Sequence, residues 1–250
     1  MNVERVCAVA FAVGLVASAA SAQEAKTTYV LATYYRCNQA TENRADAIYK
    51  ETVAPLVQKQ IDAGNLVASG WGRHWFGGEW RRLEYVMGTD LSKMVDARQA
   101  VITELMGTQK KAGDEFDAIC PSHDDYIWSS VASSQAPSAA GRERAKTSFS
   151  TYYVCDSREK EADAIVKTVF APVMNAQVKE GKISSWNWLE HFAGGKYRRL
   201  LVVDGADHKS LLSYWSMVDK SLADAQPELA QRFTEICDSH TGYIWDLGTE

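Results

Sequence analysis

The sequence lacks the motifs that identify the common classes of enzyme. Its 250 residues contain no P-loop, no GxGxxG turn, no HExxH pair and no Ser-His-Asp order, so no phosphate cradle, dinucleotide site, zinc protease or activated serine is specified. An excess of basic residues is also absent, because 27 Lys and Arg stand against 32 Asp and Glu, a formal net charge of −5. A mildly acidic surface does not attract a phosphate backbone, and nucleic acid is therefore not expected as a partner.

Long hydrophobic runs are absent from the sequence after the N-terminal region. No segment in that remaining part is long and apolar enough to cross a bilayer. At the N-terminus, Arg5 precedes a short apolar run over residues 6–16, and residues 20–22 (ASA) have the small-x-small pattern that signal peptidase accepts. We expect residues 1–22 to be a cleaved signal peptide and the mature chain to be periplasmic or secreted, without stable membrane insertion. The alternative is a short membrane anchor that stays attached.

The mature sequence contains one module written twice in tandem. The motif TYYxC at residues 33–37 recurs 118 positions later, and from Ala45 to Trp128 the matching positions are separated by 117 residues without a gap. The stretch 131–146 between the copies is rich in Ser and Ala and predicts a flexible linker. The expected organisation is a first α+β repeat over residues 23–130 and a second over residues 147–250.

Hydrophobic periodicity and turn residues predict the order β-α-β-β-α-β, with one additional helix, in each copy. Pro55 lacks the amide donor that the preceding turn of a helix needs, so we expect a break there and at Pro172 in the second copy. Gly77-Gly78 predicts a hairpin between the middle strands. In the first copy the predicted strands are 29–37, 66–76, 80–87 and 126–129, and the predicted helices are 41–63, 91–105 and 110–119. This order is the split βαβ pattern of ferredoxin-like domains.

A tandem pair of such units resembles the dimeric α/β-barrel superfamily, in which two four-stranded sheets face one another and enclose a cavity. The resemblance rests on the element order and the duplication, and it covers nearly the whole mature chain. It implies an α+β fold in which two ferredoxin-like βαββαβ repeats form a pseudo-dimeric barrel within one chain. Some members of the superfamily bind heme through a histidine on a helix. None of the five histidines here lies inside a predicted helix, so no cofactor is predicted.

Four of the five cysteines lie in the mature chain, two in each copy at equivalent positions. An oxidising compartment favours disulfides. In the ferredoxin-like strand order 4-1-3-2, the end of the first strand lies near the beginning of the fourth, which pairs Cys37 with Cys120 and Cys155 with Cys237. Each bond is expected to stabilise its half by about 4 kcal/mol in the chain-entropy model.

A zinc site is the alternative interpretation of the same residues. Cys37, Cys120 and His123, with His74, would form a Cys₂His₂ set. Because free thiolates do not persist in an oxidising compartment, the prediction remains two disulfides and no metal.

Two histidines, His74 and His191, occupy equivalent positions shortly before a Gly-Gly pair. Histidine titrates near neutrality, so each is a candidate catalytic proton-transfer group at the mouth of a cavity. The alternative is a structural role, in which the ring forms a hydrogen bond with the open backbone of the hairpin.

Two arginines, Arg82 and Arg199, alternate with the apolar residues of the third strand in each copy. If the apolar face packs against the helices, the arginines point into the space between the sheets and need an acid or an anionic ligand. Glu84 lies near Arg82, whereas Leu201 takes its place near Arg199. This difference predicts that Arg199 binds a ligand carboxylate. The alternative is a salt bridge to another acid or a solvated rim.

Four aromatic residues at matching positions, Tyr34, Tyr152, Trp71 and Trp188, are candidates for lining a pocket that stacks flat molecules. Their alternative role is packing between the sheets. The leading hypothesis is an exported protein that binds a small aromatic or carboxylate-bearing molecule within or between its halves. The second is a cofactor-free oxygenase or isomerase that uses His74 or His191. The third is a non-catalytic structural or partner-binding module.

Overall fold

The structure is a computed structural model that describes residues 27–135 and 145–248. The expected signal peptide, residues 1–22, lies outside the described residues. The first half consists of β1 (Tyr29–Arg36), α1 (Glu42–Ile48), α2 (Ala54–Asp62), β2 (Ala68–Gly77), β3 (Arg82–Gly88), α3 (Leu91–Met106), α4 (Lys110–Ile119) and β4 (Ser122–Gln135). The second half consists of β5 (Thr147–Val154), α5 (Glu159–Ile165), α6 (Ala171–Lys179), β6 (Ser185–Gly194), β7 (Arg199–Gly205), α7 (His208–Ala225), α8 (Pro227–Ile236) and β8 (Ser239–Leu247).

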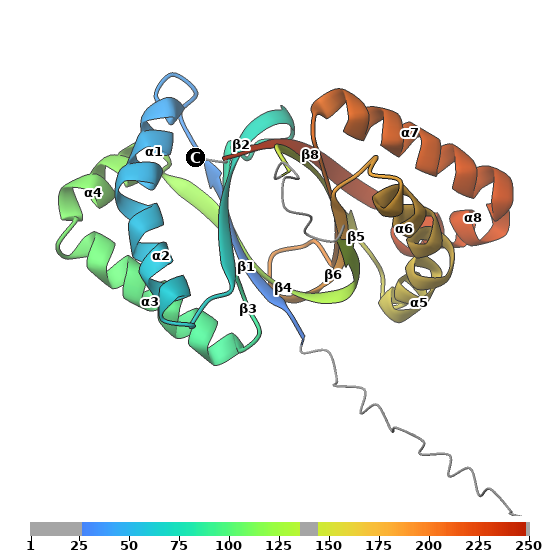
Figure 1. Ribbon diagram of the computed structural model, residues 1–250, viewed down its shortest axis with the longest axis horizontal. Coiled ribbons are helices and arrows are strands. Elements are labelled where there is room, and N and C mark those ends of the chain that lie inside the picture. The colour runs from blue at the N-terminus through green and yellow to red at the C-terminus, as the bar shows by residue number, and fades with distance from the viewer. Residues whose placement is uncertain (1–26, 136–144, 249–250) are drawn as a thin grey trace, which may run out of the picture.

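The eight strands form one closed antiparallel barrel in the order β1-β3-β2-β8-β5-β7-β6-β4 (Figure 1). The two halves join where β2 pairs with β8 and β4 pairs with β6. The expectation of two sheets that face each other is therefore corrected to a single sheet closed on itself. The physical reason is that β2 and β4 would otherwise be edge strands with unpaired backbone groups, and the edge strands of the second half satisfy these groups.

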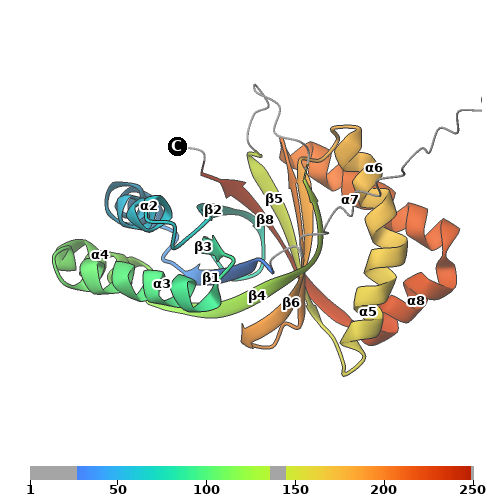
Figure 2. The ribbon, with the colours of Figure 1, turned by 60° about the horizontal axis from the view of Figure 1, so that its bottom comes forward.

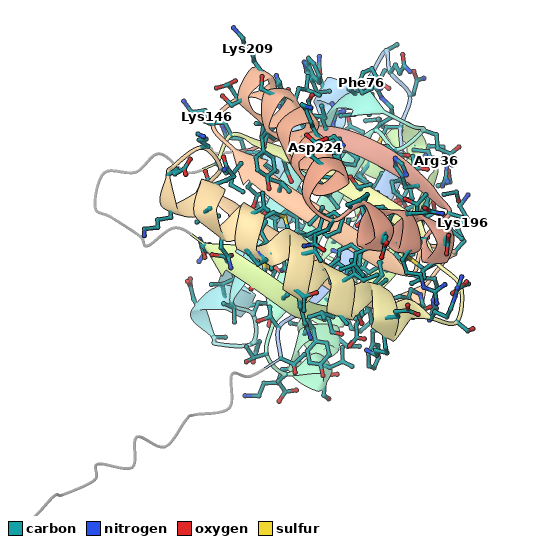
Figure 3. The ribbon with its side chains drawn as sticks, turned by 90° about the vertical axis from the view of Figure 1, so that its right-hand side faces the viewer. Arg36, Phe76, Lys146, Lys196, Lys209 and Asp224 are labelled. Atoms are coloured by element: carbon teal, nitrogen blue, oxygen red, sulfur yellow. A yellow bond between two sulfur atoms is a disulfide. The ribbon has the colours of Figure 1, made fainter. Side chains whose placement is uncertain are left out.

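The helices lie outside the barrel in two layers. Helices α1 to α4 cover the outer face of the first half and helices α5 to α8 that of the second half (Figures 1 and 2). Figure 3 shows the second layer from its own side. Separate apolar cores lie beneath each layer, and a third fills part of the barrel. Both faces of the sheet are therefore buried.

Each half contains a π-helical segment shortly before the proline that occupies the equivalent position in both copies. Residues Tyr49–Val53 precede α2, and the amide of Ala54 donates to the carbonyl of Tyr49, five residues earlier. Pro55 then lies in the first turn of α2. The first amides of an α-helix have no acceptor within that helix, so a proline there does not cost α2 a hydrogen bond. The same arrangement, with a π-helical segment Val166–Phe170, precedes Pro172. The predicted break at both prolines is confirmed.

Strand β4 is much longer than the predicted strand 126–129. It continues through Gln135, and its last residues pair with the beginning of β6, Gln135 opposite Ser185. Residues 131–135, expected to belong to the linker, are thus part of the barrel, and residues 136–144 lie outside the described residues. The Ser- and Ala-rich composition has little strand preference of its own, and the pairing with β6 overrides it.

The predicted disulfides Cys37–Cys120 and Cys155–Cys237 are both present, with sequence separations of 83 and 82 residues. Because both sulfurs of each pair are bonded to each other, the zinc alternative is wrong for these cysteines. In residues 27–135 and 145–248, no group of three or more metal-ligating side chains comes together. No helix in the same part of the chain is long and apolar enough to cross a membrane.

Candidate functional site

One end of the barrel is closed by a plug of stacked aromatic rings. Tyr34 stacks on Trp80 with 4.3 Å between ring centroids, and Trp80 stacks on Tyr243 at 4.9 Å. The plug contains Tyr34, Trp80, Tyr126, Trp128, Tyr152, Tyr197, Tyr243 and Trp245, all buried. Aromatic pairs in these geometries contribute favourable energy beyond the area they bury. The plug therefore makes a rigid floor for the space next to it.

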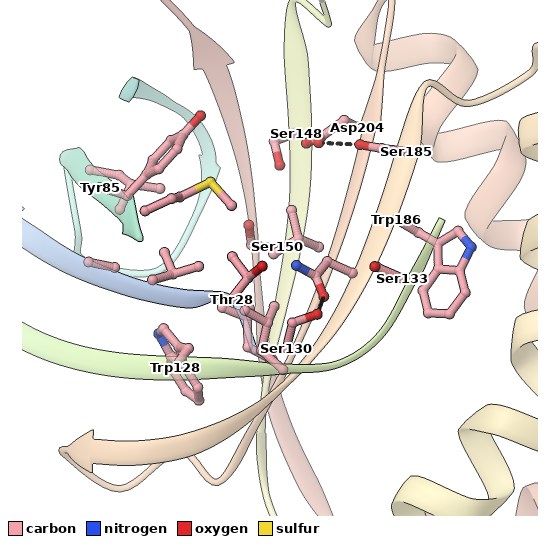
Figure 4. A pocket seen from close by; sticks show the side chains of 18 of the residues that line it. Thr28, Tyr85, Trp128, Ser130, Ser133, Ser148, Ser150, Ser185, Trp186 and Asp204 are labelled. Carbon is pink, nitrogen blue, oxygen red and sulfur yellow. Dashed lines mark hydrogen bonds between the residues drawn. The ribbon is translucent and has the colours of Figure 1, made fainter. Parts of the chain in front are cut away.

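The space next to the plug is a cavity of about 390 Å³ inside the barrel, here called the barrel cavity. A volume of this size suits a small organic molecule. Tyr34, Trp128 and Tyr152 of the plug border it, and residues of β1, β3, β4, β5, β6 and β7 form most of its walls. These walls include Val30, Ala32, Leu83, Tyr85, Met87, Ser130, Ser148, Ser150, Asn187, Leu189, Leu200, Val202 and Asp204 (Figure 4).

Several equivalent positions of the two halves differ in polarity where they line the barrel cavity. Three pairs of equivalent lining positions carry an apolar residue in the first half and a polar residue in the second: Val30 and Ser148, Ala32 and Ser150, Met87 and Asp204. The lining is thus mostly apolar on the side of β1 and β3, with Val30, Ala32, Leu83 and Met87, whereas the serines of β4, β5 and β6 and Asp204 of β7 supply most of its polar groups. Leu189 of β6 and Leu200 and Val202 of β7 are apolar residues on that second side. A bound molecule with one polar edge would be oriented by this difference.

Asp204 is the one acidic residue among the described residues that line the barrel cavity. Ser185 donates a hydrogen bond to its Oδ2 at 2.6 Å, and Ser148 also bonds to the carboxyl group. Burial raises the pKa of Asp204, although the two serine hydrogen bonds lower it in part. Across the cavity, burial and the charge of Asp204 raise the pKa of Tyr85 to about 12. Figure 4 shows Asp204, Ser148 and Ser185 together at one end of the cavity, with Trp128 further along it.

Among the described residues, the lining of the cavity places no cation beside this carboxyl group. The described residues that line the cavity include no Lys, Arg or His. Without a positive partner, the neutral form of Asp204 is favoured relative to a carboxyl group in water. The group can therefore donate a hydrogen bond when protonated and accept a proton or a hydrogen bond when ionised.

Two of the four aromatic candidates lie next to the barrel cavity, and two do not. Tyr34 and Tyr152 border the barrel cavity. Trp71 and Trp188 lie on the other face of the sheet, in the cores beneath the helices. Their indole N–H groups donate to carboxylates of the helices, that of Trp188 to Asp163 at 2.8 Å. Trp71 and Trp188 therefore do not line a pocket inside the barrel.

The expected position of Arg82 and Arg199 is wrong. Both arginines face the helices, where Arg82 contacts Asp46 at 2.5 and 2.8 Å and Arg199 contacts Asp163 at 2.7 and 2.9 Å. The apolar residues of β3 and β7 face the barrel instead. Strand alternation defines two faces but does not say which face is inside, and here the helices supply the acids that the arginines need. Arg199 is therefore already paired, and the predicted carboxylate site is absent from it.

Of the two predicted catalytic histidines, His74 bonds to the backbone of its hairpin, and His191 contacts an arginine across the equivalent hairpin. His74 contacts the carbonyl of Gly77 through Nε2 at 3.0 Å, and Arg81 donates to its Nδ1 at 2.7 Å. In these contacts Nδ1 accepts a hydrogen bond and Nε2 donates one. Arg198 contacts Nδ1 of His191 at 2.8 Å, and burial together with the charge of Arg198 lowers the pKa of His191. Neither histidine borders the barrel cavity. The backbone hydrogen bond of His74 matches the structural alternative, whereas Nε2 of His191 has no hydrogen-bond partner among the described residues.

Sequence reasoning missed Asp204 and the serines beside it. A comparison of the two copies contains the signal, because Met87 and Asp204 occupy equivalent positions on a strand whose neighbouring positions are apolar. The signal becomes interpretable only when β7 is known to turn this position toward the barrel.

Comparison with known proteins identifies the fold. No protein-family profile matches the sequence, and no curated protein sequence matches it. An anthrone oxidase-like protein of known structure superposes with a TM-score of 0.59 at 12% identity, covering 90% of this chain and 92% of that chain. A protein proposed to be a monooxygenase from Fusobacterium nucleatum gives 0.59 at 9% identity over 90% and 93% of the chains. One from Lactobacillus acidophilus gives 0.56 at 8% identity over 88% and 94%. The chain therefore has the dimeric α+β-barrel fold, with its eight strands closed into one barrel.

Proposed function

We propose that the protein binds a small, partly aromatic molecule in the barrel cavity, with a hydroxyl or amine group of that molecule directed at Asp204. The observation that carries this proposal is the placement of one buried carboxyl group and most of the polar lining on one side of the cavity, opposite a mostly apolar side. The aromatic plug offers ring faces to a flat ligand, and Asp204 with its serines selects the end that carries a hydrogen-bond donor.

The carboxylate-bearing ligand that the sequence suggested is not favoured by this cavity. Its lining has no described basic side chain, and a ligand carboxylate would meet Asp204. Two like charges in one buried site oppose each other's ionisation. The proposal therefore keeps the aromatic part of the earlier hypothesis and replaces the carboxylate by a phenol, alcohol or amine.

Binding of 1,8-dihydroxyanthrone, a flat tricyclic phenol, tests this proposal. We expect it to quench tryptophan fluorescence, because Trp128 borders the cavity. Val202→Trp should fill the cavity and abolish binding, and Asp204→Asn should weaken binding about tenfold, or about 1.4 kcal/mol. Asp238→Asn, at an exposed position outside the cavity, is the matched control and should bind normally. No binding to the wild-type protein, or unchanged affinity in the filled variant, would contradict the proposal.

A second candidate function is an enzyme in which Asp204 is the general base. The raised pKa of this buried carboxyl group brings it closer to neutrality, as proton abstraction from a weakly acidic C–H or O–H requires. Proteins with this fold include ones described as monooxygenases or anthrone oxidase-like. Oxygen uptake with 1,8-dihydroxyanthrone tests this candidate. Asp204→Asn should abolish uptake, whereas His74→Ala and His191→Ala should not, the reverse of the sequence-based hypothesis.

We further infer that the chain acts outside the cytoplasm. We also infer that its two halves are ferredoxin-like repeats that form a pseudo-dimer. The two disulfides support an oxidising compartment, and the strand order 4-1-3-2 in each half supports the repeat interpretation. Intact mass of the exported protein is the test for cleavage after residue 22, and retention of Met1 would contradict export by this route.

A further inference from the structure

A second cavity, of about 600 Å³, lies outside the barrel, between strands β1 and β4 and helices α3 and α4 of the first half, and Ala193 and Gly194 of β6 also line it. We call it the outer cavity. Apolar side chains from the sheet and from the helices form its walls, among them Leu31, Val53 and Phe116. Ile102 and Met106 of α3 also line it while remaining 38% and 43% exposed, so the outer cavity opens to solvent there. It shares no lining residue with the barrel cavity, from which the sheet separates it.

A buried polar network lies against the outer cavity. Arg98 of α3 donates to Glu84 of β3 at 2.7 Å, and the hydroxyl group of Tyr35 donates to the other oxygen of Glu84 at 2.9 Å. Arg98 also reaches the Tyr35 hydroxyl at 3.3 Å. Glu84 is 4% exposed. Burial and the charge of Glu84 raise the pKa of Tyr35 well above its usual range, so the phenol remains a donor.

The second half fills the equivalent space with large apolar side chains. The replacements are Leu201 for Glu84, Trp215 for Arg98, Phe149 for Leu31 and Phe170 for Val53. The rings of Phe149 and Trp215 lie 5.0 Å apart, and both pack against the core of that half. The same framework therefore accommodates an apolar, filled version of this layer.

Without a ligand, the cavity and buried ion pair of the first half are expected to stabilise the fold less than the apolar packing of the second half. Replacing a buried ion pair by packed apolar residues is often neutral or stabilising, and an unfilled apolar space forfeits packing energy. An occupant that fills the space and uses the polar network accounts for both features at once.

We propose that the outer cavity binds a neutral, mostly apolar molecule whose carbonyl or ether oxygen accepts a hydrogen bond from Arg98. A guanidinium group has five N–H donors, and the contacts to Glu84 and Tyr35 use two of them. Glu84 already neutralises Arg98, and Asp117 and Asp125 also border the cavity. A ligand anion would add negative charge to this set, whereas a neutral acceptor would not.

Three pyrene derivatives test the site on the full-length protein by fluorescence titration. We expect 1-acetylpyrene, which carries one carbonyl, to bind about tenfold more tightly than pyrene and than pyrene-1-carboxylate. The double substitution Glu84→Leu/Arg98→Trp introduces the residues of the second half and should remove the binding. Leu31→Phe/Val53→Phe fills the same space while leaving the ion pair intact, and it should also remove binding if the first variant does not fold.

Several outcomes would overturn the proposal. It fails if wild-type protein does not bind 1-acetylpyrene, if the carboxylate binds best, or if both filled variants retain full affinity. Loss of binding in Val202→Trp, which fills the barrel cavity, would assign the probe to that site instead. Because the two cavities share no residue, this variant also separates a failure here from a failure of the function proposed above.

Discussion

Replacing Arg199 by methionine tests whether the buried arginines are structural. The guanidinium group of Arg199 is 1% exposed and contacts Asp163 at 2.7 and 2.9 Å and Glu159 at 2.9 Å. Methionine retains part of the apolar stem but leaves Asp163 without its main partner. Breaking a buried pair in this way costs about 3–5 kcal/mol. Trp188 and Lys160 remain beside Asp163, so we expect a loss near the lower end, about 3 kcal/mol.

Urea unfolding provides the measurement, with the midpoint and slope converted to a free energy of unfolding. Arg82→Met is the matched variant in the first half. The carboxylate of its partner Asp46 is 20% exposed, against 5% for Asp163, so its loss should be smaller. Neither substitution should change the affinity for 1,8-dihydroxyanthrone. A folded Arg199→Met protein with wild-type stability and tenfold weaker binding would show that the arginine contacts the ligand and that this reasoning is mistaken.

A double substitution separates the charge effect from the loss of packing. Arg199→Met/Asp163→Leu removes both charges, so the penalty of an unpaired buried carboxylate disappears. The indole N–H of Trp188 then loses its acceptor, which costs about 1–3 kcal/mol. We expect the double variant to be more stable than Arg199→Met and less stable than wild type. A double variant less stable than the single one would refute the assignment of the loss to Asp163.

Three further predictions follow from the site and the closure of the barrel. The pKa of Asp204 is raised by folding, so its stabilising contribution is present below its unfolded pKa and is lost as the pH rises through its folded pKa. Asp204→Asn should therefore gain stability relative to wild type in urea titrations as the pH rises above the unfolded pKa of about 4, and a constant difference would contradict this. Residues 23–130 expressed alone should self-associate or aggregate in size-exclusion chromatography, because β2 and β4 lose β8 and β6; a stable monomer would contradict it. Cys37→Ala/Cys120→Ala should lower the free energy of unfolding by up to about 4 kcal/mol in the chain-entropy model, and an unchanged value would show that the closed loop of 83 residues contributes nothing.

The candidate site was only partly accessible from the sequence. Tyr34 and Tyr152 were found because the amino-acid sequence alone shows aromatic residues at matching positions of a duplicated strand. Asp204 was not found, and Arg199 was selected in its place. Both residues lie on β7, but their side chains point to opposite faces of the sheet. The prediction that the apolar face meets the helices was wrong, and this one error exchanged the barrel-facing and helix-facing residues of the strand.

The sequence by itself determined the duplication, the order of helices and strands, the break before Pro55 and the two disulfide pairs. These features follow from local periodicity, from backbone chemistry and from an order of elements that both copies repeat. The closure of β2 on β8 and of β4 on β6, and the direction in which each strand face points, were decided by tertiary structure alone. Both faces of this sheet are buried, one beneath helices and one inside the barrel, so hydrophobicity does not distinguish them. Only the packing of the whole chain places Arg82 against Asp46 and Asp204 inside the cavity.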